Sequence, residues 1–88
     1  MELKKGVVVY SLAGHDKGSF QVVMEFGDDY AMVCDGKYRP LERLKKKNLV
    51  HIKLTNKVLS DTELRSNRAI KSALRPFNES PDANAKGM

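Results

Sequence analysis

The residues best suited to bind a ligand lie in a short turn with a glycine at each end. His15, Asp16 and Lys17 lie between Gly14 and Gly18, with an apolar run on either side of the turn. Glycine adopts positive φ without steric cost and lets the backbone of a partner come close. A lysine held in such a turn suits an anionic ligand, so this turn is the first candidate site. The alternative is a hairpin whose glycines only shape the turn.

A second candidate site is a longer basic segment further along the chain. Glu42 is the only acidic residue between Lys37 and Lys57. Basic side chains held on and between strands can replace the counterions along a phosphate backbone. They can equally form an ordinary solvated surface, and Tyr38 is a candidate for stacking on an unpaired base. The candidate residues of this segment are Lys37, Tyr38, Arg39, Arg43, Lys45, Lys46, Lys47, His51 and Lys53.

The chain shows no pattern typical of catalysis or of a metal centre. Neither histidine has cysteine and carboxylate partners at the spacing of metal ligands. The glycines do not form a phosphate-binding loop, because the residues after Gly18 predict a strand and not a helix. The serines are scattered and indicate no pairing of a nucleophile with a base. We therefore expect a non-enzymatic protein without a cofactor, a metal or a small-molecule substrate.

Length, charge and cysteine content narrow the class of protein further. The 88 residues make one small domain with a limited core, and the net charge of +5 favours an anionic partner. The single cysteine, Cys34, excludes an internal disulfide and lies in an apolar run that predicts a buried strand. The charged N-terminus does not resemble a signal peptide, and no apolar stretch is long enough to span a membrane. A cytoplasmic location is expected.

Short apolar runs separated by turn residues predict the strands that must position these sites. The runs cover residues 6–10, 19–26, 30–34, 37–44 and 49–54. Phe20, Val22, Met24 and Phe26 alternate onto one face of the second run, and Val50, Ile52 and Leu54 do so in the last, and both faces are expected to lie in the core. Asp35-Gly36 predicts a two-residue hairpin, and Pro40 places the fourth run at a sheet edge. Five short strands predict a mainly β fold, a small antiparallel barrel of the SH3-like kind.

A helix is predicted after the barrel. Ser60 and Glu63 have the spacing of a capping box, and Pro76 is expected to end a helix of about residues 61–75. One side of this helix carries an apolar stripe and the opposite side a basic one. The apolar stripe comprises Ile70, Ala73, Leu74 and Phe77, and the basic stripe comprises Arg65, Arg68, Lys71 and Arg75.

The predicted organisation has three parts. A barrel covers residues 1–56, a helical extension covers 57–77, and a polar tail covers 78–88. The tail is rich in small polar residues, a composition typical of disorder.

Several of these features, in this order, resemble the KOW-domain family. Residues 6–23 are similar to a KOW motif, which has an apolar strand, a Gly-x-Asp-Lys-Gly type turn and a second apolar strand. Val33-Cys34-Asp35-Gly36 resembles a hairpin of KOW-domain large-subunit ribosomal proteins. Residues 45–52 resemble the basic strand that closes their barrel. In length and order the chain is most similar to small bacterial KOW-domain RNA-binding proteins, over about residues 5–54.

The resemblance implies an SH3-like barrel that binds RNA, often ribosomal RNA. It also implies partners in the ribosome or among ribosomal proteins. An alternative is a protein-interaction module of the transcription or translation machinery, which would use a barrel edge and the C-terminal helix. The short apolar stripe argues against a helix that binds membranes. The resemblance assigns Gly14, Asp16, Lys17 and Gly18 to the motif turn, and Lys45, Lys46, Lys47 and His51 to the basic strand.

Overall fold

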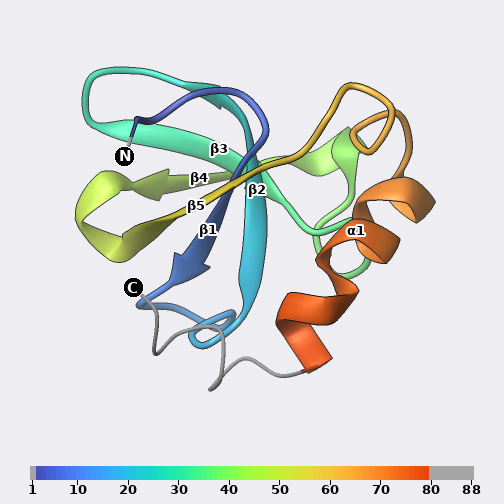
Figure 1. The fold of residues 1–88 in the computed structure, drawn as a ribbon. Coiled ribbons are helices and arrows are strands. Elements are labelled where there is room, and N and C mark those ends of the chain that lie inside the picture. The colour runs from blue at the N-terminus through green and yellow to red at the C-terminus, as the bar shows by residue number, and fades with distance from the viewer. Residues whose placement is uncertain (1, 80–88) are drawn as a thin grey trace.

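A five-stranded antiparallel sheet and one C-terminal helix form the fold in a computed structural model, which describes residues 2–79 (Figure 1). The order of the strands in the sheet is β4-β3-β2-β1-β5, so β5 returns to pair with β1 and the sheet is not closed between β4 and β5. The mainly β class and the antiparallel pairing are confirmed. The strands are β1 (Val7–Ser11), β2 (Phe20–Phe26), β3 (Tyr30–Cys34), β4 (Lys45–Asn48) and β5 (Ile52–Val58).

The first three strands lie within one residue of their predicted bounds. The alternation in β2 places Phe20 and Val22 on one buried face, although Gln21 and Val23 on the other face are buried as well. It fails at the end of the strand, because the register between β2 and β3 shifts between Val23 and Glu25. Such a bulge re-aims the side chains that follow it. Phe26 is consequently 47% exposed, and its predicted place in the core is wrong.

The fourth predicted strand, residues 37–44, is wrong. The Asp35 carboxylate accepts hydrogen bonds from the backbone N–H groups of Lys37 (2.8 Å) and Arg39 (2.9 Å), which opens a longer loop in place of a two-residue hairpin. Pro40 follows with no N–H to donate to a sheet, and the loop continues into the 3-10 helix η1 (Leu41–Arg43). The strand that pairs with β3 is therefore the lysine run itself, β4.

The last strand begins and ends later than predicted. Residues Leu49–His51 form a second 3-10 helix, η2, in which the Asn48 side chain accepts a hydrogen bond from the Val50 N–H (3.1 Å). Val50 is 73% exposed, so its predicted place in the core is wrong, whereas Ile52 is buried as predicted. β5 then extends to Val58, past the predicted barrel boundary at residue 56.

Two apolar clusters cover the two faces of the strongly twisted sheet (Figure 1). Because β1 contributes to both clusters, it is apolar on both faces and does not alternate with polar residues. The first cluster lies between the sheet and the C-terminal segment and comprises Val8, Phe20, Val22, Cys34, Leu59, Leu64, Ile70 and Leu74. The second lies on the other face and comprises Val7, Val9, Val23, Ala31, Val33 and Ile52.

The helix α1 (Asn67–Glu79) is shifted toward the C-terminus relative to the prediction. The capping box between Ser60 and Glu63 does form, with both backbone-to-side-chain hydrogen bonds, but the residues that follow it make turns. Ser66 caps the helix, because its hydroxyl accepts a hydrogen bond from the Ala69 N–H (3.1 Å). Pro76 lies inside the helix, so its predicted role as the stop is wrong.

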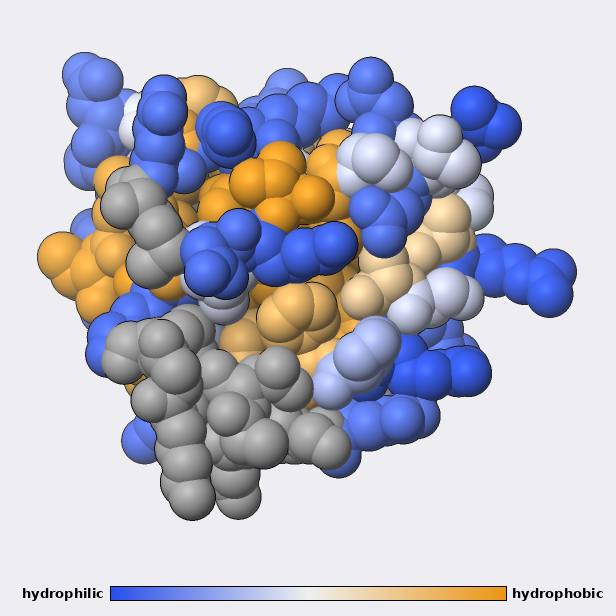
Figure 2. Space-filling view, viewed as in Figure 1, coloured by the Kyte–Doolittle hydropathy of each residue, from blue (hydrophilic) through white to orange (hydrophobic). Residues whose placement is uncertain are grey.

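The predicted apolar stripe of the helix faces the first cluster. Ile70 and Leu74 are fully buried, and the Phe77 ring lies 5.3 Å from the Phe20 ring, centroid to centroid. Figure 2 shows that apolar residues remain visible in the middle of this view, with hydrophilic residues around them. Asn78 belongs to the helix and not to the predicted tail, whose residues 80–88 lie outside the described part of the chain.

Candidate nucleic-acid interface

The glycine-bracketed turn between β1 and β2 is held by its own backbone. Gly14 and Gly18 have φ of +88° and +90°, a conformation that favours glycine. The Gly18 N–H donates to the carbonyl of Ser11 (2.9 Å), and the Lys17 N–H donates to the carbonyl of Gly14 (3.2 Å). His15 and Lys17 are left exposed on the outside of the turn.

The fold brings this turn against the lysine strand β4. A Cβ atom on Gly14 would lie 3.4 Å from Nζ of Lys47 and 3.8 Å from Nζ of Lys45. The Leu12 N–H donates to the carbonyl of His51 (2.8 Å), which fastens the start of the turn to η2. Together these segments surround a shallow hollow of about 280 Å³. It is lined by Ala13, Gly14, Lys45, Lys46, Lys47, Asn48 and His51.

Lys47 is a buried internal partner of the turn and is not a surface lysine. It is 5% exposed. Its ammonium donates to Oδ1 of Asp16 (2.7 Å), to the hydroxyl of Ser11 (2.9 Å) and to the carbonyl of Ala13 (2.6 Å). An ammonium group has three N–H donors, and all three are used. Lys47 therefore fixes the turn to β4 and has no donor left for an external phosphate.

Asp16 is the acceptor at the centre of this network. Its Oδ2 accepts a hydrogen bond from the side-chain amide of Gln21 (2.6 Å) and lies 3.8 Å from Nζ of Lys45. Burial alone raises the pKa of Asp16, but hydrogen bonds from Lys47, Ser11 and Gln21 outweigh burial and lower the pKa from 3.8 to about 2. Asp16 is thus ionised at neutral pH and neutralises Lys47.

Alternation along β4 divides the three consecutive lysines. Successive strand residues point to opposite faces, so Lys45 and Lys47 approach the turn while Lys46 lies on the other face. The Lys46 ammonium sits over the ring of Tyr30, 4.9 Å from the centroid. Because Lys47 already balances Asp16, Lys45 supplies excess positive charge on the side of the turn and Lys46 supplies it on the opposite face of β4.

The remaining candidate residues lie away from the hollow. Lys53 is exposed on β5, and Arg43 is exposed on η1. Arg39 is half-buried and donates from Nη1 to the carbonyl of Arg43 (3.4 Å). Lys37 and Tyr38 lie on the loop after β3, where the Lys37 ammonium sits over the Tyr38 ring (4.9 Å).

Four residues of this region are not among those predicted from the sequence, and one of them is Ala13, which lines the hollow and accepts a hydrogen bond from Lys47 through its carbonyl. Ser11 and Gln21 belong to the Asp16–Lys47 network, and Asn48 lines the hollow. Gln21 inside an otherwise apolar strand is the signal that points to the network, because a buried amide needs a polar partner. The carbonyl oxygen of Gln21 is buried without a hydrogen-bond partner in the described structure.

Nothing in the described structure forms a metal centre or a reactive thiol. Within residues 2–79, no three His, Cys, Asp or Glu side chains gather closely enough to hold a metal ion. Burial, together with the nearby carboxylates of Asp35 and Glu42, raises the pKa of the Cys34 thiol to about 12. Cys34 is therefore a structural residue, since the thiolate is the reactive form.

Comparisons with known proteins give no assignment. No model of a known protein family matches the chain, and a search of curated proteins finds no match. No helix in the described part of the chain is long and apolar enough to cross a membrane. The geometry of the site is thus the main support for a function.

Proposed function

We propose that this chain is a non-enzymatic, cytoplasmic RNA-binding protein with an SH3-like barrel of the KOW type. It binds the phosphates of structured RNA, such as ribosomal RNA, in the hollow between the glycine-bracketed turn and β4. The observation that carries the proposal is the approach of Gly14 to the lysine strand. This approach places a turn that allows close backbone contact next to β4. Two lysines of β4, Lys45 and Lys46, are not needed to balance the charge of Asp16.

Each residue has a distinct role in this proposal. Lys45 contacts a phosphate on the side of the turn, Lys46 contacts one from the opposite face of β4, and Lys17 adds a contact from the exposed side of the turn. Gly14 lets the sugar-phosphate backbone approach the turn, and Lys47 holds the turn in place from inside. Phosphate contacts of this kind position a protein without reading base sequence, so shape complementarity to folded RNA provides the selectivity.

The test is the salt dependence of binding to a ribosomal RNA hairpin. The affinity of the intact chain should fall steeply with salt, because each phosphate contact releases counterions. In the double variant Lys45→Gln/Lys46→Gln, the slope of log K against log salt should shrink by roughly 0.7–0.9 for each phosphate that the variant no longer neutralises. Lys47 is left unchanged, because its removal would disturb the turn itself.

The matched control is the double variant Lys4→Gln/Lys5→Gln. It removes the same charge from two exposed lysines that do not line the hollow. Its salt slope should equal that of the unchanged chain. If the salt slope fell equally in both double variants, the binding would be non-specific electrostatic attraction. An affinity that did not depend on salt would exclude the phosphate mechanism.

The open edges of the sheet favour a second candidate function, a protein-interaction module. Within the described part of the chain, strand β5 pairs only with β1, and β4 pairs only with β3. An extended peptide can add a strand to such an edge through main-chain hydrogen bonds. Peptide binding of this kind would persist at high salt and survive the Lys45→Gln/Lys46→Gln change, which separates it from the first proposal.

A further inference from the structure

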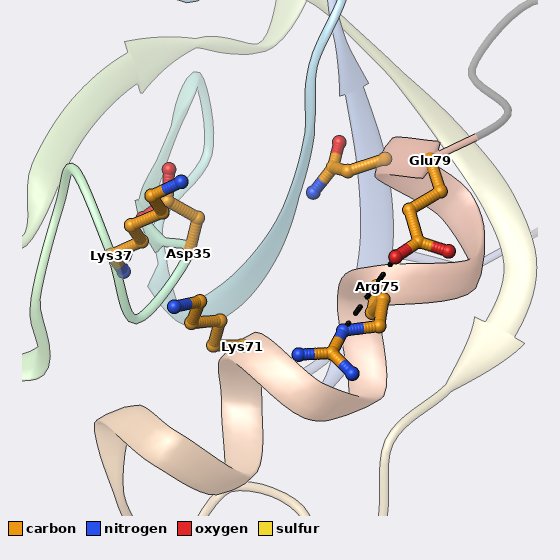
Figure 3. A pocket seen from close by; sticks show the side chains of 6 residues that line it. Asp35, Lys37, Lys71, Arg75 and Glu79 are labelled. Carbon is orange, nitrogen blue, oxygen red and sulfur yellow. Dashed lines mark hydrogen bonds and ion pairs between the residues drawn. The ribbon is translucent and has the colours of Figure 1, made fainter.

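A second basic hollow lies between α1 and the loop that follows β3, apart from the glycine-bracketed turn. It has a volume of about 410 Å³ (Figure 3). Figure 3 shows Lys71 extending from the helix toward the loop that carries Asp35 and Lys37. Cations from two segments far apart in the sequence thus share one hollow. Its lining comprises Asp35, Lys37, Lys71, Arg75, Asn78 and Glu79.

The two walls of this hollow are held together by a contact that only glycine permits. Gly36 has φ of +78°, and a Cβ atom there would lie 2.2 Å from the carbonyl oxygen of Asn67 and 3.0 Å from the backbone nitrogen of Lys71. Such distances are well inside van der Waals contact. The Asn67 side chain adds a hydrogen bond from the Leu41 N–H (2.7 Å). The backbone of the loop that carries Lys37 is therefore held at a fixed position against the start of the helix that carries Lys71.

Lys71 and Arg75 of this hollow are available to a ligand, and one of its two carboxylates, Asp35, is engaged by the backbone. Oδ1 of Asp35 already accepts two backbone N–H groups. The Arg75–Glu79 ion pair is long (3.7 Å), and both side chains are well exposed, so solvent screens it and it holds Arg75 weakly. Lys71 has no ion pair within residues 2–79.

An aromatic ring stands beside Lys37, one of the cations that line this hollow. Tyr38 is 82% exposed, which makes it the most exposed large hydrophobic side chain in the described structure. One of its faces lies under the Lys37 ammonium. Bases of single-stranded RNA stack on exposed aromatic rings, while adjacent cations hold the phosphate backbone. An acidic protein segment could pair with the cations, but its carboxylates would not stack on the Tyr38 ring.

We infer that this hollow binds an unpaired RNA nucleotide, with its phosphate on Lys71 and Arg75 and its base stacked on Tyr38. The inference rests on the proposed function and extends it, since it gives the protein a second contact for a single-stranded segment next to a folded one. Lys37 links the two parts, because it lines the hollow and also lies over the ring.

The test compares two RNA probes, a hairpin stem and the same stem with a short single-stranded extension. The intact chain should bind the extended probe more tightly. The double variant Lys71→Gln/Arg75→Gln should lose this advantage and still bind the bare stem. Tyr38→Ala should reduce affinity for the extended probe roughly ten-fold, the effect of losing one stacked base, and Tyr38→Phe should retain it.

The matched control for charge is Arg65→Gln/Arg68→Gln, which changes two exposed residues near α1 that do not line the hollow. It should keep the preference for the extended probe. Equal binding of both probes by the intact chain would overturn the inference while leaving the proposed function standing. Loss of stem binding in Lys45→Gln/Lys46→Gln tests the proposed function separately. An acidic peptide that displaces the extension without affecting the stem would assign the hollow to a protein partner and overturn the inference.

Discussion

At the scale of single residues, the main distinction in this protein is between neighbouring lysines of one strand. Lys47 is buried and makes three hydrogen bonds, whereas Lys46 is exposed one position earlier. Removing one member of a buried ion pair leaves the other charge uncompensated, which is strongly destabilising. The turn therefore depends on a charge that a binding assay alone could mistake for an RNA contact.

The ion pair between Lys47 and Asp16 should contribute measurably to the stability of the fold. Lys47→Met should lower the free energy of unfolding by roughly 3 kcal/mol, measured by urea denaturation at pH 7. The control Lys53→Met changes an exposed lysine of β5 and should fall within about 0.5 kcal/mol of the intact chain. A Lys47→Met chain as stable as the control would contradict the structural role of the ion pair.

The same pair makes stability depend on acid. The folded-state pKa of Asp16 is about 2 against 3.8 for the free group, so its ionised form stabilises the fold. This contribution, about 2 kcal/mol, is complete above pH 4 and is lost as pH falls through 2. Stability measured between pH 5 and pH 2 should drop by less in Lys47→Met than in the intact chain.

The sequence predicts which segments form the site, but it does not predict the role of each residue in it. The glycine turn and the basic segment are recognisable because their residue types are unusual and close together in the chain. Which of Lys45, Lys46 and Lys47 is buried depends on the phase of β4 relative to the turn. That phase follows from tertiary pairing of β4 with β3, and the local pattern carries no trace of it.

Among the secondary-structure elements, the contact between α1 and the loop after β3 accounts for two of the errors in the predicted bounds. The Asp35-Gly36 pair is a strong local hairpin signal, yet Gly36 serves as the contact surface for the start of α1. The Ser60–Glu63 capping box forms but opens only a set of turns. The helix starts at Asn67, where its first turn meets the loop after β3. Tertiary packing thus overrides two correct local signals.

The reactivity of Cys34 can report whether α1 is docked on the sheet. The thiol is fully buried in the first cluster, between β3 and α1, so reaction with a soluble thiol reagent requires the protein to open. Leu74→Ala should destabilise the interface by about 2 kcal/mol or more, which accelerates labelling of Cys34 roughly thirty-fold. Ser72→Ala, at an exposed position of the same helix, should leave the labelling rate unchanged. Equal rates in the two variants would mean that α1 does not shield the thiol.

In the molecule as a whole, the helix and the sheet share one apolar cluster, so we expect them to unfold together. Val8, Phe20 and Val22 of the sheet share a cluster with Ile70 and Leu74 of the helix. Each fully buried aliphatic side chain contributes about 1.5–3 kcal/mol. Because a small domain is only marginally stable, with about 5–15 kcal/mol in total, the loss of this interface is enough to unfold the chain.

Truncation of the chain tests whether the sheet can fold without the helix. A chain that ends at residue 59 lacks the helix and exposes one face of the sheet. It should show no cooperative thermal transition and should bind a hydrophobic dye. A chain that ends at residue 79 keeps both clusters and should melt cooperatively, like the intact protein. A separate peptide of residues 60–79 should restore the transition to the shorter chain, and the same peptide with Leu74→Asp should not. A cooperative transition in the shorter chain alone would show instead that the sheet is stable by itself, with the helix docked on it as an accessory.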